Sequence, residues 1–465
     1  MPPALSMVLE RASRVPCSAD AAFAWHERPG AFERLTPPWE HAEVVERTGG
    51  IKDGGRVVVR VGAPMALRWV ARHRDYQAGR QFVDEQIEGP FARWVHLHRF
   101  DPDGPSACII TDRIDYSPPL GAVGAAGEPF LIRPRLERML GYRHELLRGD
   151  LEAHARFTDR PRQRVAITGA SGLIGRSLSP FLTTGGHEVV RLVRRHAGAG
   201  EVSWNYQQGR VDSAGLEGLD TVVHLAGENI AARWTKDRRR RIIESRVIGT
   251  RFVSETLARL SRPPRVLIAA SAIGVYGDRG EEVLTEASST PDAPRDFLAE
   301  LAREWEAATE PARAAGIRVV LLRFGIVLSP AGGALKRMLP PFRLGLGGPL
   351  GSGRQYMSWV AIDDLLGAIH HAMMTEALAG PVNATAPQPV TGRAFATVLG
   401  RVLDRPALLP VPALALRLAL GEMADVAVLS STRVLPVRLQ ESGYHFRYPD
   451  LEGALRYLLG RAARA

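Results

Sequence analysis

The sequence predicts an α/β fold with a doubly wound parallel sheet, preceded by a smaller α+β domain. From about residue 165 onward, apolar strand-like runs alternate with helical patterns, which is typical of a parallel sheet covered by helices on both faces. Before residue 115, short runs of period-two alternation follow one another with only turn residues between them, which indicates antiparallel strands. At 465 residues the chain is long enough for two or three domains.

The first region contains the antiparallel pattern. Alternation is clearest over residues 56–61 and 92–100, and clusters of glycine and aspartate at 49–55 and 101–104 mark turns. After these strands, residues 128–155 carry apolar side chains at helical spacing. We therefore expect one long helix that lies across an antiparallel sheet.

Residues 5–155 resemble the START-like, polyketide-cyclase-type ligand-binding superfamily. The resemblance rests on the order of the elements and on phrases such as residues 93–100. It implies a helix-grip domain, in which a curved sheet grips a C-terminal helix around an apolar cavity. The expected partner of this domain is an apolar small-molecule ligand.

Two histidines, His96 and His98, share one face of a predicted strand with Trp94 and Phe100. They could be metal ligands, polar groups in a ligand cavity, or side chains that form only local hydrogen bonds. Because no acidic or cysteine/histidine partner stands at a recognisable spacing, the sequence predicts no metal site.

The charge of the chain suggests a nucleic-acid partner, but its distribution does not. The net charge is +10, and the basic residues are almost all arginines spread along the sequence, with only three lysines. The dense run at residues 238–241 falls in a probable helix, where a solvated face is the expected role. We predict no nucleic-acid partner.

Membrane and disulfide signals are missing from the sequence. No apolar run is long enough for a membrane span and no secretory signal is evident at the start, so we expect a cytoplasmic protein without a span. Cys17 and Cys108 are expected to be buried thiols.

A glycine-rich turn follows the first strand of the second region. An apolar run over residues 165–168 leads directly into Gly169, Gly172 and Gly175, and a helix is expected from Leu173 to residue 182. Such glycines allow a sharp turn and close approach to a pyrophosphate, and the helix N-terminus favours an anion. Strand, turn and helix together predict a dinucleotide site.

The end of the next strand suggests which dinucleotide is bound. Residues 187–193 end in Arg194 and Arg195, where an NAD-specific site carries an acidic residue for the ribose hydroxyls. Arginine suits the extra phosphate of NADP, so we predict NADP(H). The predicted cofactor-binding residues are Gly169, Ser171, Gly172, Leu173, Ile174, Gly175, Arg194, Arg195, Leu225, Ala226, Gly227 and Arg246.

The second region resembles the extended short-chain dehydrogenase/reductase superfamily, and within it the atypical NAD-dependent epimerase/dehydratase-like branch. The phrases that carry this resemblance are residues 168–175, 225–227, 271–277, 323–325 and 339–355. This resemblance implies a Rossmann-like NADP-binding domain with a substrate lid over 164–395 and a small helical cap over 396–465. With the resemblance of the first region, which implies a START-like domain over 1–158, it gives three predicted domains.

The usual catalytic set of this superfamily is incomplete here. It comprises a serine or threonine, a tyrosine, and a lysine four residues after the tyrosine; Ser271 matches the first, but no tyrosine in the chain has lysine four positions on. Tyr276 could serve as proton donor, or could pack near the nicotinamide. Arg246 replaces a common asparagine. Further along, Asp363 or Asp364 is expected to cap a helix.

Two functions follow as hypotheses. The first is an oxidoreductase or epimerase-like enzyme that acts on a small or apolar carbonyl or alcohol, with Ser271 and Tyr276 as its catalytic residues. The second is an NADP(H)-responsive binding protein that keeps the fold without the proton relay.

Overall fold

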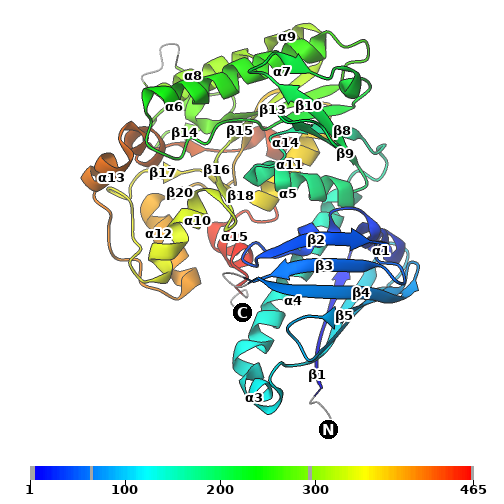
Figure 1. The fold of residues 1–465 in the computed structure, drawn as a ribbon. Helices are drawn as coiled ribbons and strands as arrows, with labels where there is room; N and C mark the ends of the chain where they lie inside the picture. Colours follow the sequence, from blue (N-terminus) through cyan, green and yellow to red (C-terminus); the bar gives the residue numbers. More distant parts are fainter. Residues whose placement is uncertain (1–5, 63–65, 292–295, 462–465) are drawn as a thin grey trace. The chain divides into compact units, whose positions relative to one another are not determined.

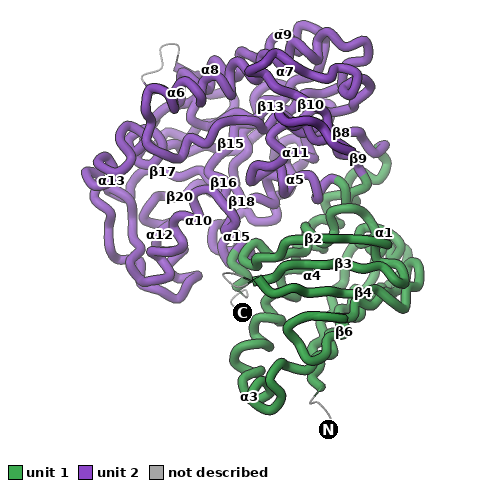
Figure 2. Tube along the Cα trace, in the orientation of Figure 1, with its two compact units in different colours: residues 1–160, 183–186, 459–465 green, residues 161–182, 187–458 purple. Residues whose placement is uncertain are grey.

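The computed structural model describes residues 6–62, 66–291 and 296–461. The chain forms two compact units (Figures 1 and 2). Unit 1 consists of residues 1–160, 183–186 and 459–465, and unit 2 consists of residues 161–182 and 187–458.

Unit 1 is built on a seven-stranded antiparallel sheet, as the sequence predicts. Its strand order is β1-β7-β6-β5-β4-β3-β2, so that all neighbours except the pair β1 and β7 are consecutive in the chain. The strands are β1 (Met7–Val15), β2 (Ala42–Thr48), β3 (Arg56–Val61), β4 (Leu67–Gln77), β5 (Gln81–Glu88), β6 (Arg93–Pro102) and β7 (Cys108–Ser117).

Helices cover one face of this sheet. They are α1 (Ala19–Glu27), α2 (Ala31–Leu35) and α4 (Arg133–Ala155), and α4 extends across the strands in Figure 1, whereas α3 (Gly121–Leu131) lies next to the start of α4. Leu147 and Leu151 of α4 pack in one core with Phe82, Phe100 and Ile110 of the strands. This packing is the helix-grip arrangement expected for a START-like domain.

The single helix predicted over residues 128–155 is wrong at its N-terminal end. The chain forms two helices there, because α3 ends at Leu131 and α4 begins at Arg133. Pro134 stands in the first turn of α4, where its missing N–H costs nothing because no residue of the helix would accept it.

Unit 2 contains an eight-stranded sheet in the order β11-β10-β9-β8-β12-β13-β15-β19. All neighbours are parallel except β10 and β11. The strands are β8 (Arg164–Thr168), β9 (Glu188–Val193), β10 (Glu201–Asn205), β11 (Arg210–Val211), β12 (Thr221–His224), β13 (Val266–Ala272), β15 (Arg318–Phe324) and β19 (Gly380–Ala384). The strand order reverses direction between β8 and β12, which defines the topological switch point of a doubly wound sheet.

Helices flank both faces of this sheet, with α7, α8 and α9 on one side and α5 and α11 on the other (Figure 1). Val253 and Leu257 of α7 pack against Ala166, Val222 and Leu267 in the main core. The helices are α5 (Leu173–Thr184), α6 (Lys236–Ile243), α7 (Gly249–Ala258), α8 (Phe297–Ala307), α9 (Glu310–Ala314) and α11 (Ile362–Met374).

The remaining elements of unit 2 are short strand pairs and C-terminal helices. The strand pairs are β14 (Val283–Leu284) with β21 (Arg433–Val434), β16 (Ile326–Leu328) with β18 (Trp359–Ala361), and β17 (Tyr356–Met357) with β20 (Val390–Thr391). The helices are α10 (Gly333–Arg343), α12 (Gly392–Leu403), α13 (Ala413–Leu420), α14 (Val437–Glu441) and α15 (Leu451–Leu458). Within the described ranges, no helix combines the length and the apolar character that crossing a membrane would require.

The predicted capping role of Asp363 or Asp364 is wrong. The residue at the N-cap of α11 is Ala361, which forms no side-chain capping hydrogen bond, and Asp363 and Asp364 lie inside the first turn. The Asp364 carboxylate instead accepts the backbone N–H groups of Arg447 and Tyr448. Asp364 therefore fastens a C-terminal segment to α11, a contact that local sequence does not reveal.

Candidate functional site

The switch point of the unit 2 sheet is held by Thr168 and His224, which are paired in register at the ends of β8 and β12. The Thr168 hydroxyl oxygen accepts the backbone N–H groups of Leu225 and Ala226 at 3.0 and 3.1 Å. Its own hydrogen therefore points to Nδ1 of His224, 2.8 Å away.

The other ring nitrogen of His224 completes this connection. Because Nδ1 accepts, Nε2 carries the proton, and it donates to the Thr250 hydroxyl of α7 at 3.0 Å. Trp305 also donates to Thr250. Burial lowers the pKa of His224 to about 4, so the ring is neutral at pH 7. Both strand ends are thereby fixed to the helix layer.

In the glycine turn between β8 and α5, backbone atoms approach one another closely. Gly169 has φ of +66°, and a Cβ there would lie 2.8 Å from the Leu225 carbonyl carbon. A Cβ on Gly175 would lie 2.4 Å from the Gly169 oxygen. At Gly172 a Cβ would meet only the Gly169 oxygen, at 3.2 Å, and would otherwise point into open space. Gly172 therefore keeps clear a cradle at the start of α5.

The arginine pair that follows β9 lies at the surface. Arg194 and Arg195 are both exposed. Two nitrogens of Arg195 each lie 2.7 Å from an oxygen of the Glu201 carboxylate on β10. These hydrogen bonds lower the pKa of Glu201. Glu201, which sequence reasoning missed, therefore orients the guanidinium of Arg195.

Arg246 lies beside the strand end that was predicted to face the cofactor. It belongs to a π-helical turn, Glu244–Ile248, a rare geometry that is frequent at functional sites. Its guanidinium stacks on Trp305 and donates to the Glu228 carbonyl. A Cβ on Gly227 would lie 3.2 Å from this guanidinium. Burial lowers the pKa of Arg246 to about 10, which leaves it charged at pH 7.

The two predicted catalytic residues meet in one buried network. The Ser271 hydroxyl donates to Glu306 at 2.7 Å, and Glu306 accepts two hydrogen bonds from Arg323. Arg323 also donates to the Tyr276 hydroxyl at 2.9 Å, which in turn donates to the amide oxygen of Asn383. Ser271 and Tyr276 are thus linked through an ion pair.

Burial defines what Tyr276 can contact. Its side chain is fully buried, and its hydroxyl has a donor and an acceptor partner inside the protein. Burial raises the pKa of the phenol above its ordinary value. Any proton that Tyr276 exchanges would have to pass through Arg323 or Asn383.

Sequence reasoning missed Glu306 as a partner of Ser271. Glu306 lies on α8, two residues beyond Glu304, and nothing in the local sequence marks it as the partner of Ser271. The location of Arg323 and Asn383 could be predicted in part from the sequence, because each lies on an apolar strand that leads to the same edge of the sheet.

Together, the switch-point turn, the strand order and the helices on both faces define unit 2 as a Rossmann-like domain of the dinucleotide-binding type. Comparison with family models agrees with this class. Residues 165–384 match the NAD dependent epimerase/dehydratase family, residues 15–139 match the polyketide cyclase/dehydrase and lipid transport family, and residues 411–458 match a domain of unknown function.

Comparison with individual proteins also places unit 2 among epimerase family proteins. An epimerase family protein of Mycobacterium bovis, Mb2239, is 44% identical over 299 residues, which are 64% of this chain and 98% of the relative. The human epimerase family protein SDR39U1 is 35% identical over 301 residues, covering 64% of this chain and 99% of its own length. The chain therefore belongs to the epimerase family.

Two crystal structures extend the comparison. The nucleoside-diphosphate sugar epimerase from Corynebacterium glutamicum is 35% identical, covers 97% of this chain and 90% of its own, and superimposes with a TM-score of 0.80. Human SDR39U1 (isoform 2) with NADPH is 33% identical and covers 63% of this chain and 98% of its own, with a TM-score of 0.59. The first of these structures thus matches almost all of the chain.

Proposed function

We propose that unit 2 binds NADP(H), and that the protein is a reductase or epimerase-like enzyme that acts on a small or apolar carbonyl or alcohol. The observation that carries this proposal is the cradle at Gly172, which opens at the switch point of the sheet. The human relative of 33% identity, whose crystal structure contains NADPH, supports it.

The residues present fit a dinucleotide. The turn from Gly169 to Gly175 would hold the pyrophosphate against the start of α5, since Gly172 leaves that space free of side chains. Arg194 and Arg195 would bind the 2′-phosphate, with Glu201 holding the guanidinium of Arg195 in place. A bound NADP(H) supplies hydride transfer.

Positive charge near the strand ends would assist a substrate oxygen. Arg246 remains charged at pH 7 and lies against Gly227, at the end of β12. We propose that it stabilises negative charge on the substrate or cofactor near this edge. Ser271 and Tyr276 are proposed as catalytic residues that act through the network of Glu306 and Arg323.

A second function is favoured by the burial of Tyr276. A tyrosine that is fully buried, with a raised pKa and two internal partners, is a poor proton donor to a substrate at the strand edge. An NADP(H)-responsive binding protein needs no such donor. Its apolar ligand would occupy a cavity of about 760 Å³ that residues of unit 1 line.

Calorimetric titration of the full chain with NADPH, NADP, NADH and NAD tests nucleotide binding, which both functions require. We expect micromolar binding with NADP(H) preferred, and loss of that binding in Gly172→Val, whose side chain fills the cradle. Gly141→Val is the matched control, because Gly141 lies in a helix of unit 1 and a Cβ there would come no closer than 3.6 Å to Arg11. Absence of binding to all four nucleotides would overturn the proposal.

Turnover separates the two functions. A screen of carbonyl and alcohol compounds, followed at the nicotinamide absorbance, supports the enzyme if nucleotide oxidation or reduction depends on both compound and protein. Tight NADP(H) binding without turnover of any compound supports the binding protein.

A further inference from the structure

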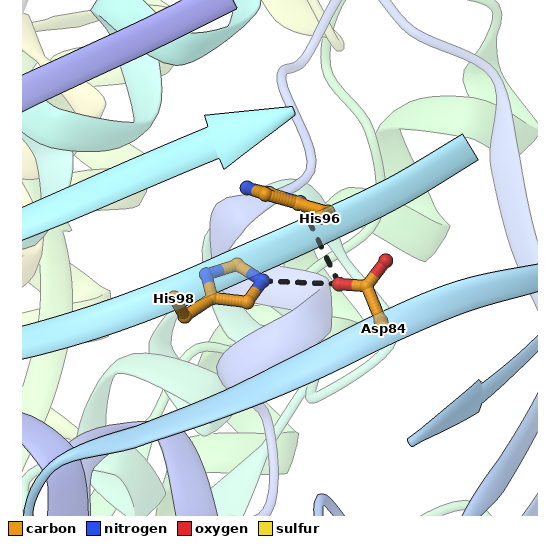
Figure 3. A group of neighbouring side chains, drawn as sticks. All are labelled: Asp84, His96 and His98. Carbon is orange, nitrogen blue, oxygen red and sulfur yellow. Dashed lines mark hydrogen bonds and ion pairs between the residues drawn. The ribbon is translucent and has the colours of Figure 1, made fainter. Parts of the chain in front are cut away.

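Three side chains with metal-ligating atoms meet inside unit 1: Asp84 on β5, and His96 and His98 on β6 (Figure 3). The two strands are antiparallel neighbours, and Asp84 stands directly opposite His96 in their register. His96 and His98 point to the same face because alternate residues of a strand share a face. Strand pairing therefore brings the three together.

The spacing of their atoms is that of ligands around one ion. Asp84 Oδ2 lies 3.0 Å from His98 Nε2 and 3.5 Å from His96 Nδ1. One ligand atom from each of the three residues lies within 4.8 Å of the other two. Atoms bound to one Zn²⁺ at about 2.0–2.2 Å stand roughly 3 to 3.5 Å apart. Only small shifts would be needed to accommodate an ion.

A second carboxylate, Asp112 on β7, orients both histidine rings. Nε2 of His96 donates to Asp112 Oδ1 at 2.9 Å, and Nδ1 of His98 lies 2.6 Å from the same oxygen. A carboxylate oxygen accepts hydrogen bonds, so the ring protons face Asp112. Nδ1 of His96 and Nε2 of His98 are then left to face Asp84. Metal-binding histidines typically donate their other N–H to a carboxylate in this way.

A cation satisfies this arrangement better than a proton does. A proton on Nε2 of His98 would satisfy its contact with Asp84. The lone pair of His96 Nδ1 would still face the Asp84 carboxylate at 3.5 Å, acceptor against acceptor. A divalent ion between the three atoms removes this conflict, because it accepts the lone pair of His96 Nδ1 and attracts the Asp84 carboxylate.

The cluster lines a cavity. Asp84, His96 and His98 are among the residues around a space of about 760 Å³ in unit 1, whose walls include Trp69, Phe82 and Trp94. His96 and His98 are buried, whereas the Asp84 side chain is 23% exposed. Three protein ligands beside open space match sites in which a further coordination position takes water or a ligand.

We propose that unit 1 binds one divalent first-row transition metal ion through Asp84, His96 and His98, with its open coordination positions facing the apolar cavity. Two imidazoles and a carboxylate suit Zn²⁺ or Fe²⁺. This departs from the sequence-based prediction of no metal site. That prediction lacked an acidic partner, and Asp84 reaches His96 through strand pairing instead of through local spacing.

Metal analysis of the untagged full chain tests the proposal. After loading with Zn²⁺ and dialysis, we expect one equivalent of zinc per chain. Co²⁺ should give the visible absorption of an ion bound by nitrogen and oxygen, and Zn²⁺ should displace it. Zinc-edge absorption of the loaded parent should show imidazole and oxygen ligands. Failure to retain zinc and to develop a cobalt spectrum would overturn the proposal, as would sulfur ligands.

Substitutions locate the ion. Asp84→Asn and His98→Gln should each weaken zinc binding by more than the roughly 100-fold that loss of an outer hydrogen-bond partner costs. Asp112→Asn should weaken binding by about 10- to 100-fold with one equivalent still bound at saturation. His41→Gln, an exposed cavity residue outside the cluster, is the matched control. Circular dichroism checks that each variant folds. Unchanged zinc affinity in folded Asp84→Asn and His98→Gln would also overturn the proposal.

Discussion

Arg323 and Glu306 form a two-pronged ion pair inside unit 2, with Nε and Nη2 of the arginine each 2.8 Å from a carboxylate oxygen. Their side chains are only 7% and 13% exposed. Ser271 and Tyr276 each hydrogen-bond to one member of the pair. The two candidate catalytic side chains therefore depend on one electrostatic contact for their positions.

Removing one partner of this pair should destabilise the protein strongly. Glu306→Ala leaves the Arg323 charge buried without its carboxylate, and the expected loss is roughly 3–5 kcal/mol. Urea unfolding followed by circular dichroism measures it. Glu310→Ala, which breaks the exposed pair with Arg313, is the control, with an expected loss of no more than about 1 kcal/mol. Equal losses in the two variants would contradict the prediction.

Tyr276→Phe removes the hydroxyl that joins Arg323 to Asn383. We expect a stability loss of about 1–3 kcal/mol because both partners lose a buried hydrogen bond. NADPH affinity, measured by calorimetry, should not change. If Tyr276 exchanges a proton, turnover of any substrate that the screen identifies should be abolished; turnover equal to that of the parent would remove it from the mechanism.

Cofactor preference should depend on the arginine pair after β9. Replacing Arg194 and Arg195 together with alanine should weaken NADP(H) binding by roughly 10- to 100-fold, since charged hydrogen bonds to the 2′-phosphate are lost. NAD(H) binding should change little. Arg191→Ala is the control, because Arg191 also pairs with Glu201 but lies within β9. Calorimetry that showed equal losses for both nucleotides would reject the assignment.

His224 should make stability depend on pH. Its folded pKa is about 4, below the ordinary 6.5, so the unfolded chain binds an extra proton between these values. The free energy of unfolding should therefore be unaffected by the titration of His224 above about pH 6.5. It should fall by roughly 3 kcal/mol as the pH decreases from 6.5 to about 4.

Comparing the parent with His224→Gln tests this pH dependence. Glutamine can keep an acceptor and a donor but does not titrate, so unfolding midpoints of the variant should vary less between pH 6.5 and 4. His26 of unit 1 shifts in the same direction and is present in both proteins, so its effect cancels in the comparison. Parallel profiles for parent and variant would show that His224 does not contribute.

The sequence by itself determined the class of each unit and the location of the glycine turn. Periodicity of two and alternation of strands with helices follow directly from which side chains must be buried, so both sheets could be predicted. Gly169, Gly172 and Gly175 have a local role, since the backbone turn and the clearance at the start of α5 depend on a few adjacent residues.

Only the tertiary structure decided which polar groups meet. Glu306 reaches Ser271 from a helix, and Asp364 accepts backbone N–H groups more than eighty residues away. Asp84 lies opposite His96 on the neighbouring strand. These partners are set by the register of strands and by the packing of helices on sheets, because burial of a charge requires a partner in space and not in sequence. Local patterns therefore predicted where the backbone goes, whereas the pairing of charges came from the assembled fold.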